Sequence, residues 1–205
     1  MVRYWKSKER LVFQVMISLL LLIFPTTAAA GTIQGKVDNK RMRDNANVVV
    51  YIAQYLDQPN VKFKPPAEDA VLAQNQLLFV PHVLPVLQGT RVAFVNDDEV
   101  GHNVMSPSKT KRFNLGTYPR GSVRHVVFDQ PGVVALLCTH HQEMSAYIVV
   151  TETPFFAVTN EEGHFEIEDV PAGRYILKTW HEKSEPTSRE ITVGSSLTIE
   201  IILEN

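Results

Sequence analysis

The segment that decides the fold runs from residue 128 to residue 150 and reads FDQPGVVALLCTHHQEMSAYIVV. It contains two apolar runs, Val133 to Leu137 and Tyr147 to Val150. Runs of β-branched and aromatic residues between turn residues predict strands. Between the two runs lie one cysteine, two adjacent histidines and one methionine. The pattern therefore predicts two strands joined by a tight loop that carries several potential metal-binding side chains.

The rest of the chain after residue 30 has the same β character. Short runs rich in Val, Ile, Phe and Tyr are separated by Gly, Pro, Asn and Asp. Only segment 66–72 has features of a helix start, a proline followed by acidic residues. Many short strands at close spacing predict an all-β protein built from antiparallel sandwiches or barrels. Further strands are expected at 47–52, 90–96, 123–128, 165–167, 175–180 and 197–203.

The first thirty residues have the organisation of a secretory signal peptide. Four basic residues precede the apolar run 11–24, and Ala28-x-Ala30 is an acceptable cleavage site. The apolar run is shorter than the ~20 residues that span a bilayer, and an uncleaved anchor is the alternative. We therefore expect cleavage before Gly31, a mature chain without a membrane span, and a periplasmic or secreted location.

Composition and charge exclude several classes of protein. The chain has 20 Lys and Arg against 22 Asp and Glu, and removal of residues 1–30 leaves 16 against 21, a net charge of −5. It lacks the basic excess that nucleic-acid binding requires. Because Cys138 is the single cysteine, the chain cannot form an intramolecular disulfide, a four-cysteine zinc site or its own iron–sulfur cluster. In an oxidising compartment we expect this thiol to be buried, paired with another chain or bound to a metal.

The cysteine, the methionine and two histidines are spaced as a soft metal site. His102 lies upstream, and the pattern C-x-x-H-x-x-M follows at Cys138, His141 and Met144. Two imidazoles, a thiolate and a weak axial thioether are the ligand set of electron-transfer copper sites. The alternative, a buried inert cysteine with surface histidines, does not account for this order.

The pattern resembles the cupredoxin family, and the loop spacing is closest to that of amicyanin. Segments 79–84, 89–96 and 128–132 are similar to the framework of that family, and the resemblance covers about residues 70 to 153. It implies a Greek-key β-sandwich that binds one copper ion, which cycles between Cu(I) and Cu(II). The ligands implied by the resemblance are His102, Cys138, His141 and, in the axial position, Met144.

The resemblance also implies a shell of supporting residues. The side chain of Asn103 would bond to Thr139, and its backbone N–H would point at the Cys138 sulfur. The carbonyl of Gly101 would approach the metal on the face opposite Met144, a plain tight turn at Gly101 being the alternative.

The remaining histidines and one acidic run need no metal to explain them. His140 is expected to be an exposed neighbour of the site, although it could compete with His141 as ligand. The acidic run 97–99 either steers a basic redox partner such as a c-type cytochrome or is a solvated polar turn. The other histidines, expected at the surface, are His82, His125, His164 and His181.

The flanking pieces of the chain resemble a second family. The segments TNEEGHF at 159–165 and VPAGRY at 170–175 are similar to the carboxypeptidase regulatory-like, transthyretin-like β-sandwich, and GKVD at 35–38 fits its first strand. We expect residues 31–55 and 154–205 to form one discontinuous sandwich, residues 56–65 a linker, and residues 66–153 a cupredoxin domain inserted in a surface loop. The alternative is that the first hairpin extends the cupredoxin sheet.

These features predict an exported type 1 copper protein that carries single electrons between protein redox partners. The combination resembles exported methylamine-utilisation or plastocyanin-like proteins. We expect it not to be an enzyme, because four protein ligands leave no open position on the metal. A copper-binding or chaperone protein that stores or delivers the ion is the alternative, and a structural adhesion module is a third.

Overall fold

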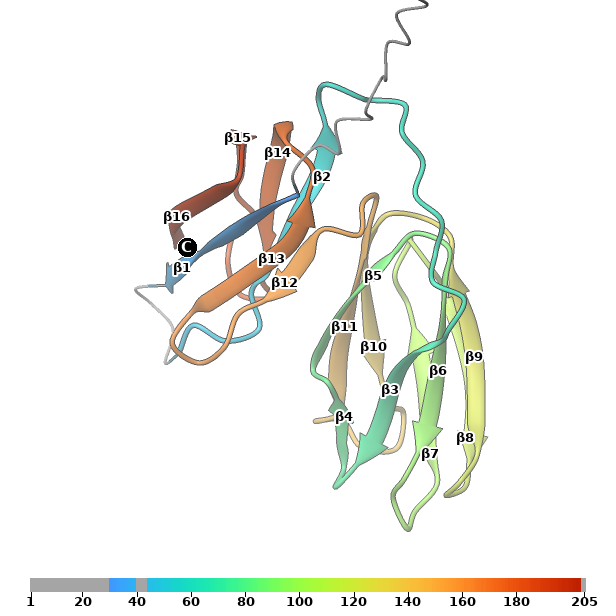
Figure 1. Ribbon diagram of the computed structural model, residues 1–205. Helices are drawn as coiled ribbons and strands as arrows, with labels where there is room; N and C mark the ends of the chain where they lie inside the picture. The colour runs from blue at the N-terminus through green and yellow to red at the C-terminus, as the bar shows by residue number, and fades with distance from the viewer. Residues whose placement is uncertain (1–29, 40–43, 204–205) are drawn as a thin grey trace, which may run out of the picture.

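Figure 1 shows the computed structural model, which describes residues 30–39 and 44–203. These residues form sixteen strands and no helix, so the all-β prediction is confirmed. In the described part of the chain, no helix is long and apolar enough to cross a membrane. The predicted signal peptide, except for Ala30, lies outside the described residues.

The first sandwich combines the beginning and the end of the described chain (Figure 1). One sheet has the strand order β13-β1-β16 and the other the order β12-β2-β14-β15, and their facing side chains form one core. The strands are β1 (Gly31–Asn39), β2 (Val49–Tyr55), β12 (Phe156–Val158), β13 (His164–Val170), β14 (Gly173–Trp180), β15 (Ser188–Val193) and β16 (Ser196–Leu203).

The second sandwich is formed by the middle of the chain. Its two sheets have the strand orders β4-β3-β6-β9 and β5-β11-β10-β7-β8, and a separate core lies between them. The strands are β3 (Ala70–Asn75), β4 (Leu78–Val80), β5 (Val83–Leu87), β6 (Thr90–Asn96), β7 (His102–Ser106), β8 (Phe113–Tyr118), β9 (Val123–Phe128), β10 (Gly132–Leu137) and β11 (Ser145–Thr151). The domain boundaries and the transthyretin-like relationship stay predictions.

Alternation of side chains explains why these segments are strands. In β14, Tyr175, Leu177 and Thr179 are buried while the residues between them are partly exposed. In β16, Ile199 and Ile201 face the core in the same way. Successive side chains of a strand point to opposite faces, so alternation of this kind places one apolar face on a core.

The helix expected at 66–72 is not present. Residues from Ala70 onward belong to β3, which pairs in parallel with β6, and Leu72 is fully buried in the second core. The proline and acidic residues do favour a helix start. Strand pairing and burial of Leu72 outweigh that local preference.

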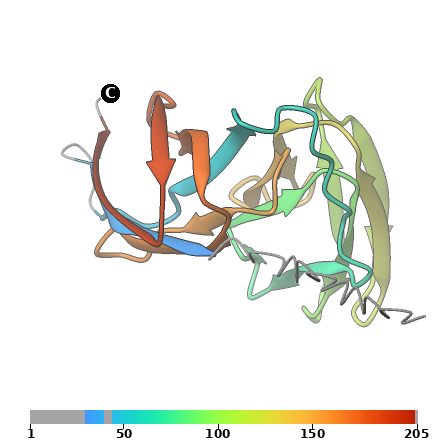
Figure 2. The same cartoon turned by 45° about the horizontal axis from the view of Figure 1, so that its top comes forward.

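The two sandwiches lie side by side (Figure 2) and share a small apolar cluster. Val49 of the first sandwich packs with Val83 and Val149 of the second, and the partly buried rings of Tyr147 and Trp180 flank them. The ring centroids of Tyr147 and Trp180 are 5.1 Å apart. The contact therefore combines apolar burial with a close aromatic pair.

Substitution of Gly35 tests the parallel pairing of β1 with β16. A Cβ atom at this position would lie 2.0 Å from the carbonyl oxygen of Ile199. Because backbone must move to relieve the clash, we expect Gly35→Ala to lower the free energy of unfolding by about 1–3 kcal/mol. Chemical denaturation measures this, with Gly194→Ala as control because nothing lies within 4 Å of a Cβ there. Equal stability of the two variants would contradict the close approach of β1 and β16.

Candidate metal centre

Three strands and one loop bring the predicted ligands together at one end of the second sandwich. His102 is the first residue of β7, Cys138 directly follows β10, and His141 lies in the loop before β11. His102 is fully buried, Cys138 is 5% exposed, and His141 is partly buried. The loop is closed by backbone hydrogen bonds from Cys138 N–H to Met144 O (3.2 Å) and from Met144 N–H to His141 O (3.1 Å).

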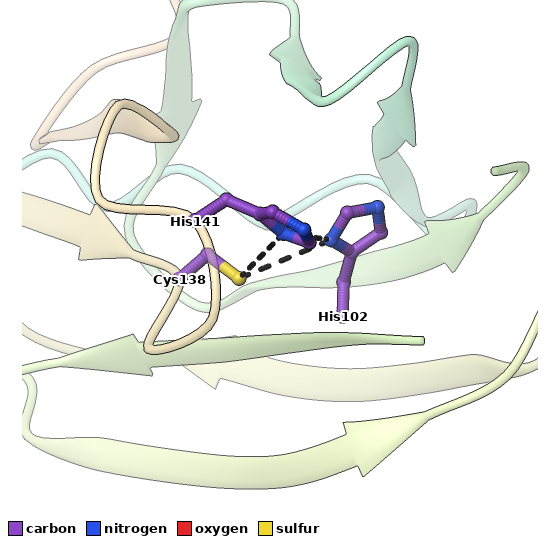
Figure 3. Close-up of side chains that lie close together, drawn as sticks. All are labelled: His102, Cys138 and His141. Carbon is purple, nitrogen blue, oxygen red and sulfur yellow. Dashed lines mark hydrogen bonds between the residues drawn. The ribbon is translucent and has the colours of Figure 1, made fainter. Parts of the chain in front are cut away.

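The side chains of these three residues point toward one another (Figure 3). Nδ1 of His102 and Nδ1 of His141 are 3.1 Å apart, and Sγ of Cys138 lies 3.9 Å from the first and 3.8 Å from the second. Among the described residues, this is the one group of three or more His, Cys, Asp or Glu side chains close enough to hold a metal ion.

The triangle has the dimensions of a metal site. The point equidistant from its three corners lies about 2.1 Å from each. For comparison, imidazole nitrogen and thiolate sulfur bind zinc at ~2.0–2.3 Å. The residues present therefore fit a first-row transition metal bound by two imidazoles and one thiolate. That donor set suits copper in both oxidation states, because soft sulfur favours Cu(I) and imidazole accommodates Cu(II).

Met144 lies in the same buried cluster as Cys138. Its side chain is 1% exposed, and its backbone closes the ligand loop at both N–H and C=O. This placement is compatible with an axial thioether, and the axial role of Met144 stays a prediction.

Asp98 is a residue of the site whose role the sequence analysis did not identify. Nε2 of His102 donates a hydrogen bond to Oδ2 of Asp98 over 2.7 Å. A proton on Nε2 leaves the lone pair on Nδ1, the atom that faces Cys138 and His141. Asp98 therefore holds His102 in the tautomer and orientation that a metal ligand needs. In the sequence, only its position four residues before His102 indicates this role. The acidic residues on either side of Asp98 make that indication hard to recognise.

The turn between β3 and β4 holds Asp98 in place. Gln76 and Leu77 both have positive φ angles of 54° and 59°, and both direct their backbone N–H groups at the Asp98 carboxylate. The side chain of Asn96 accepts a hydrogen bond from Asp98 N–H at 2.9 Å. Burial raises the pKa of the Asp98 carboxyl, but the hydrogen bonds from Leu77, His102 and Gln76 outweigh it and hold that pKa below its usual range. Asp98 is thus a charged acceptor at pH 7.

Loss of the Asp98 charge should weaken the metal site. We expect Asp98→Asn to reduce copper affinity by about 10- to 100-fold, because an amide cannot accept all three donors and no longer stabilises the His102 tautomer. Competition with a chelator of known affinity measures this. The control is Asp97→Asn, the same change at the exposed neighbouring residue. Equal affinity of the two variants would show that Asp98 does not support the site.

The contacts of the predicted supporting residues differ from those that the resemblance implies. The side chain of Asn103 donates through Nδ2 to Oδ1 of Asn114 (2.8 Å), and its buried Oδ1 has no partner among the described atoms. The expected bond to Thr139 is therefore not formed, and Thr139 is exposed. The reason is that β7 pairs with β8 with a register shift between Asn103 and Met105, and Asn114, the partner of Met105, lies within reach of the Asn103 side chain. The approach of the Gly101 carbonyl to the metal stays a prediction.

The other histidines divide into surface and interior positions. His140 is exposed, and its Nε2 lies 2.6 Å from Oγ1 of Thr117, away from the triangle. His125 pairs with Asp69, and His164 is exposed. The surface prediction is wrong for His181, which is 4% exposed and whose pKa burial lowers. His82 is only partly exposed, at 33%, because Glu182 of the first sandwich lies 3.1 Å from its Nε2.

The three residues of the acidic run differ in their partners. Asp98 accepts the three hydrogen bonds described above, and Glu99 forms an ion pair with Arg120. Among the described residues, Asp97 alone of the three has no side-chain partner. Whether this run steers a basic redox partner stays a prediction.

No family model and no curated protein matches the chain. Among solved structures, a purple cupredoxin from Nitrosopumilus maritimus is 26% identical over 40% of this chain and 100% of its own, with a TM-score of 0.37. A reduced amicyanin variant is 19% identical over 42% of this chain and 84% of its own, with a TM-score of 0.39. A copper-containing nitrite reductase from Thermus scotoductus SA-01 is 23% identical over 57% of this chain and 28% of its own, with a TM-score of 0.41.

Proposed function

We propose that this protein binds one copper ion and carries single electrons between protein redox partners. The observation that carries the proposal is the triangle formed by His102 Nδ1, His141 Nδ1 and Cys138 Sγ, whose dimensions and donor types suit copper. Bound copper would supply a one-electron couple between Cu(II) and Cu(I). No catalytic step is proposed.

The protein's part is to hold the ligands so that they need not move when an electron arrives. His102 is fixed by β7 and by Asp98, and Cys138 by the end of β10. The loop is closed on itself by its backbone hydrogen bonds. A rigid arrangement lowers the rearrangement that accompanies a change of oxidation state, which is what an electron carrier requires.

His141 gives the site its contact with the surface. It is partly buried, whereas His102 is enclosed. Two apolar side chains near the site are exposed: Leu77, whose N–H bonds to Asp98, and Val100, which lies two residues before His102. We propose that a redox partner docks over this apolar region rather than through the acidic run, and that the protein acts after export from the cytoplasm.

Addition of Cu(II) to the purified protein tests the function. We expect an intense visible absorption band from thiolate-to-copper charge transfer, an EPR signal of Cu(II) bound to sulfur, and a reversible one-electron wave in voltammetry. Colourless Cu(I) binding with ready transfer to an acceptor would instead support copper storage or delivery. Absence of the charge-transfer band at full copper loading would overturn the electron-carrier proposal.

A further inference from the structure

The side chain of Glu182 in the first sandwich contacts the second sandwich. Glu182, in the turn after β14, lies 3.1 Å through Oε1 from Nε2 of His82, which precedes β5. The Glu182 side chain is 19% exposed and that of His82 is 33% exposed. This is a partly buried polar contact between the two sandwiches, in addition to the apolar cluster that they share.

The second nitrogen of His82 is also engaged. Nδ1 lies 3.2 Å from the carbonyl oxygen of Ser145. Both ring nitrogens therefore lie within hydrogen-bond distance of an oxygen atom. The ring is thus held at one nitrogen by Glu182 of the first sandwich and at the other by the Ser145 carbonyl, so Glu182 supports the orientation of the ring toward Ser145.

Ser145 lies where the two ends of the ligand loop meet. It directly follows Met144, and in the β10–β11 ladder it pairs with Leu137, the residue before Cys138. Next to this pair, Cys138 N–H donates to Met144 O. A displacement of the Ser145 carbonyl would therefore move both ends of the loop that carries Cys138, His141 and Met144.

Tyr147 packs against the contact between Glu182 and His82. The ring of His82 packs edge-on against Tyr147 with centroids 5.7 Å apart, and Tyr147 N–H donates to His82 O at 2.9 Å. Burial and, after it, the nearby negative charge of Glu182 raise the pKa of Tyr147. Burial raises the pKa of Glu182, but the hydrogen bonds and charge of its neighbours, His82 first, hold that pKa below its usual range. Glu182 thus has two partners from the second sandwich.

We propose that Glu182 is a positioning residue for the metal-ligand loop. Through His82 it holds the Ser145 carbonyl, so the first sandwich sets the geometry of a site that lies wholly in the second. The connection between Glu182 and the loop stands on the contacts described above, and its effect on copper rests on the proposed function.

The first measurement needs no metal. In the apoprotein, Glu182→Gln should speed amide hydrogen exchange of residues 138–145 by about fivefold to tenfold, because one charge-assisted hydrogen bond is weakened. The matched control is Glu185→Gln, the same change at an exposed residue of the same turn that has no side-chain partner among the described residues. A second variant, His82→Phe, keeps a ring against Tyr147 but removes both bonds and should give the same acceleration. The double variant should exchange no faster than His82→Phe.

The second measurement uses the copper-loaded protein. Glu182→Gln and His82→Phe should both shift the reduction potential and the copper hyperfine splitting in EPR, whereas Glu185→Gln should leave both at the wild-type values. Lower thermal stability with unchanged loop exchange and unchanged spectra would assign Glu182 a merely structural role and overturn the proposal. Faster loop exchange in a protein that never shows a charge-transfer band would retain the positioning of the loop and reject only the copper function.

Discussion

Replacing Cys138 with serine is expected to abolish the charge-transfer band of the copper-loaded protein completely. The band requires a thiolate bound to Cu(II), and Cys138 is the only cysteine of the chain. Serine is similar in size and the position is 5% exposed, so the variant can keep the fold. Its hydroxyl stays protonated at pH 7 and is a much weaker ligand for copper than a thiolate. We therefore also expect lower copper affinity.

Visible absorption, EPR and copper quantification of the same samples separate these effects. Gln142→Ala is the control, since Gln142 is exposed in the same loop and should leave the band unchanged. Circular dichroism establishes that the serine variant is folded. If a folded Cys138→Ser protein retained the band, the sulfur donor would be assigned incorrectly and the triangle would not be the copper site.

The second large effect is a contrast between two adjacent histidines. His141→Ala should eliminate the blue site, because it removes the nitrogen that lies 3.1 Å from His102 Nδ1 and 3.8 Å from Cys138 Sγ. His140→Ala should retain it, because the His140 ring is exposed and contacts Thr117 instead. Neighbouring residues of one loop thus differ in the direction of their side chains, and the sequence could not distinguish them with certainty.

The comparison requires both alanine variants at equal copper loading, with absorption and EPR recorded for each. His164→Ala, at an exposed position in the first sandwich, controls for the loss of a histidine that binds copper nonspecifically. A lost band in His140→Ala together with a retained band in His141→Ala would reverse the ligand assignment and require the loop to adopt another conformation when metal binds.

Much of the strand pattern could be predicted from local sequence. The expected strands at 90–96 and 123–128 have the bounds observed for β6 and β9. Alternation of apolar and polar residues within a single strand indicates which face of that strand is buried. No information about other segments is needed. The helix prediction for segment 66–72 was wrong because its helix signals are local. The pairing of β3 with β6 involves residues about twenty positions away.

The role of Asp98 could not be predicted for the same physical reason. Its backbone N–H is held by Asn96 and its carboxylate by the turn at Gln76 and Leu77, whereas the sequence shows only three consecutive acidic residues. His82 is a similar case. The sequence predicts that its side chain faces outward, but Glu182 of the neighbouring sandwich contacts it and leaves it 33% exposed.

The sequence by itself determined the type of side chain available for chemistry: one thiol, a histidine three residues later and an upstream histidine, set among strands that alternate. Donor type and loop spacing are local properties, so they restrict the metal before any fold is known. The tertiary structure decided which nitrogen of His102 faces the sulfur, which acidic residue fixes it, and how the first sandwich reaches the ligand loop. These depend on contacts between segments far apart in the chain, whose relative positions are set by sheet pairing and core packing rather than by local pattern.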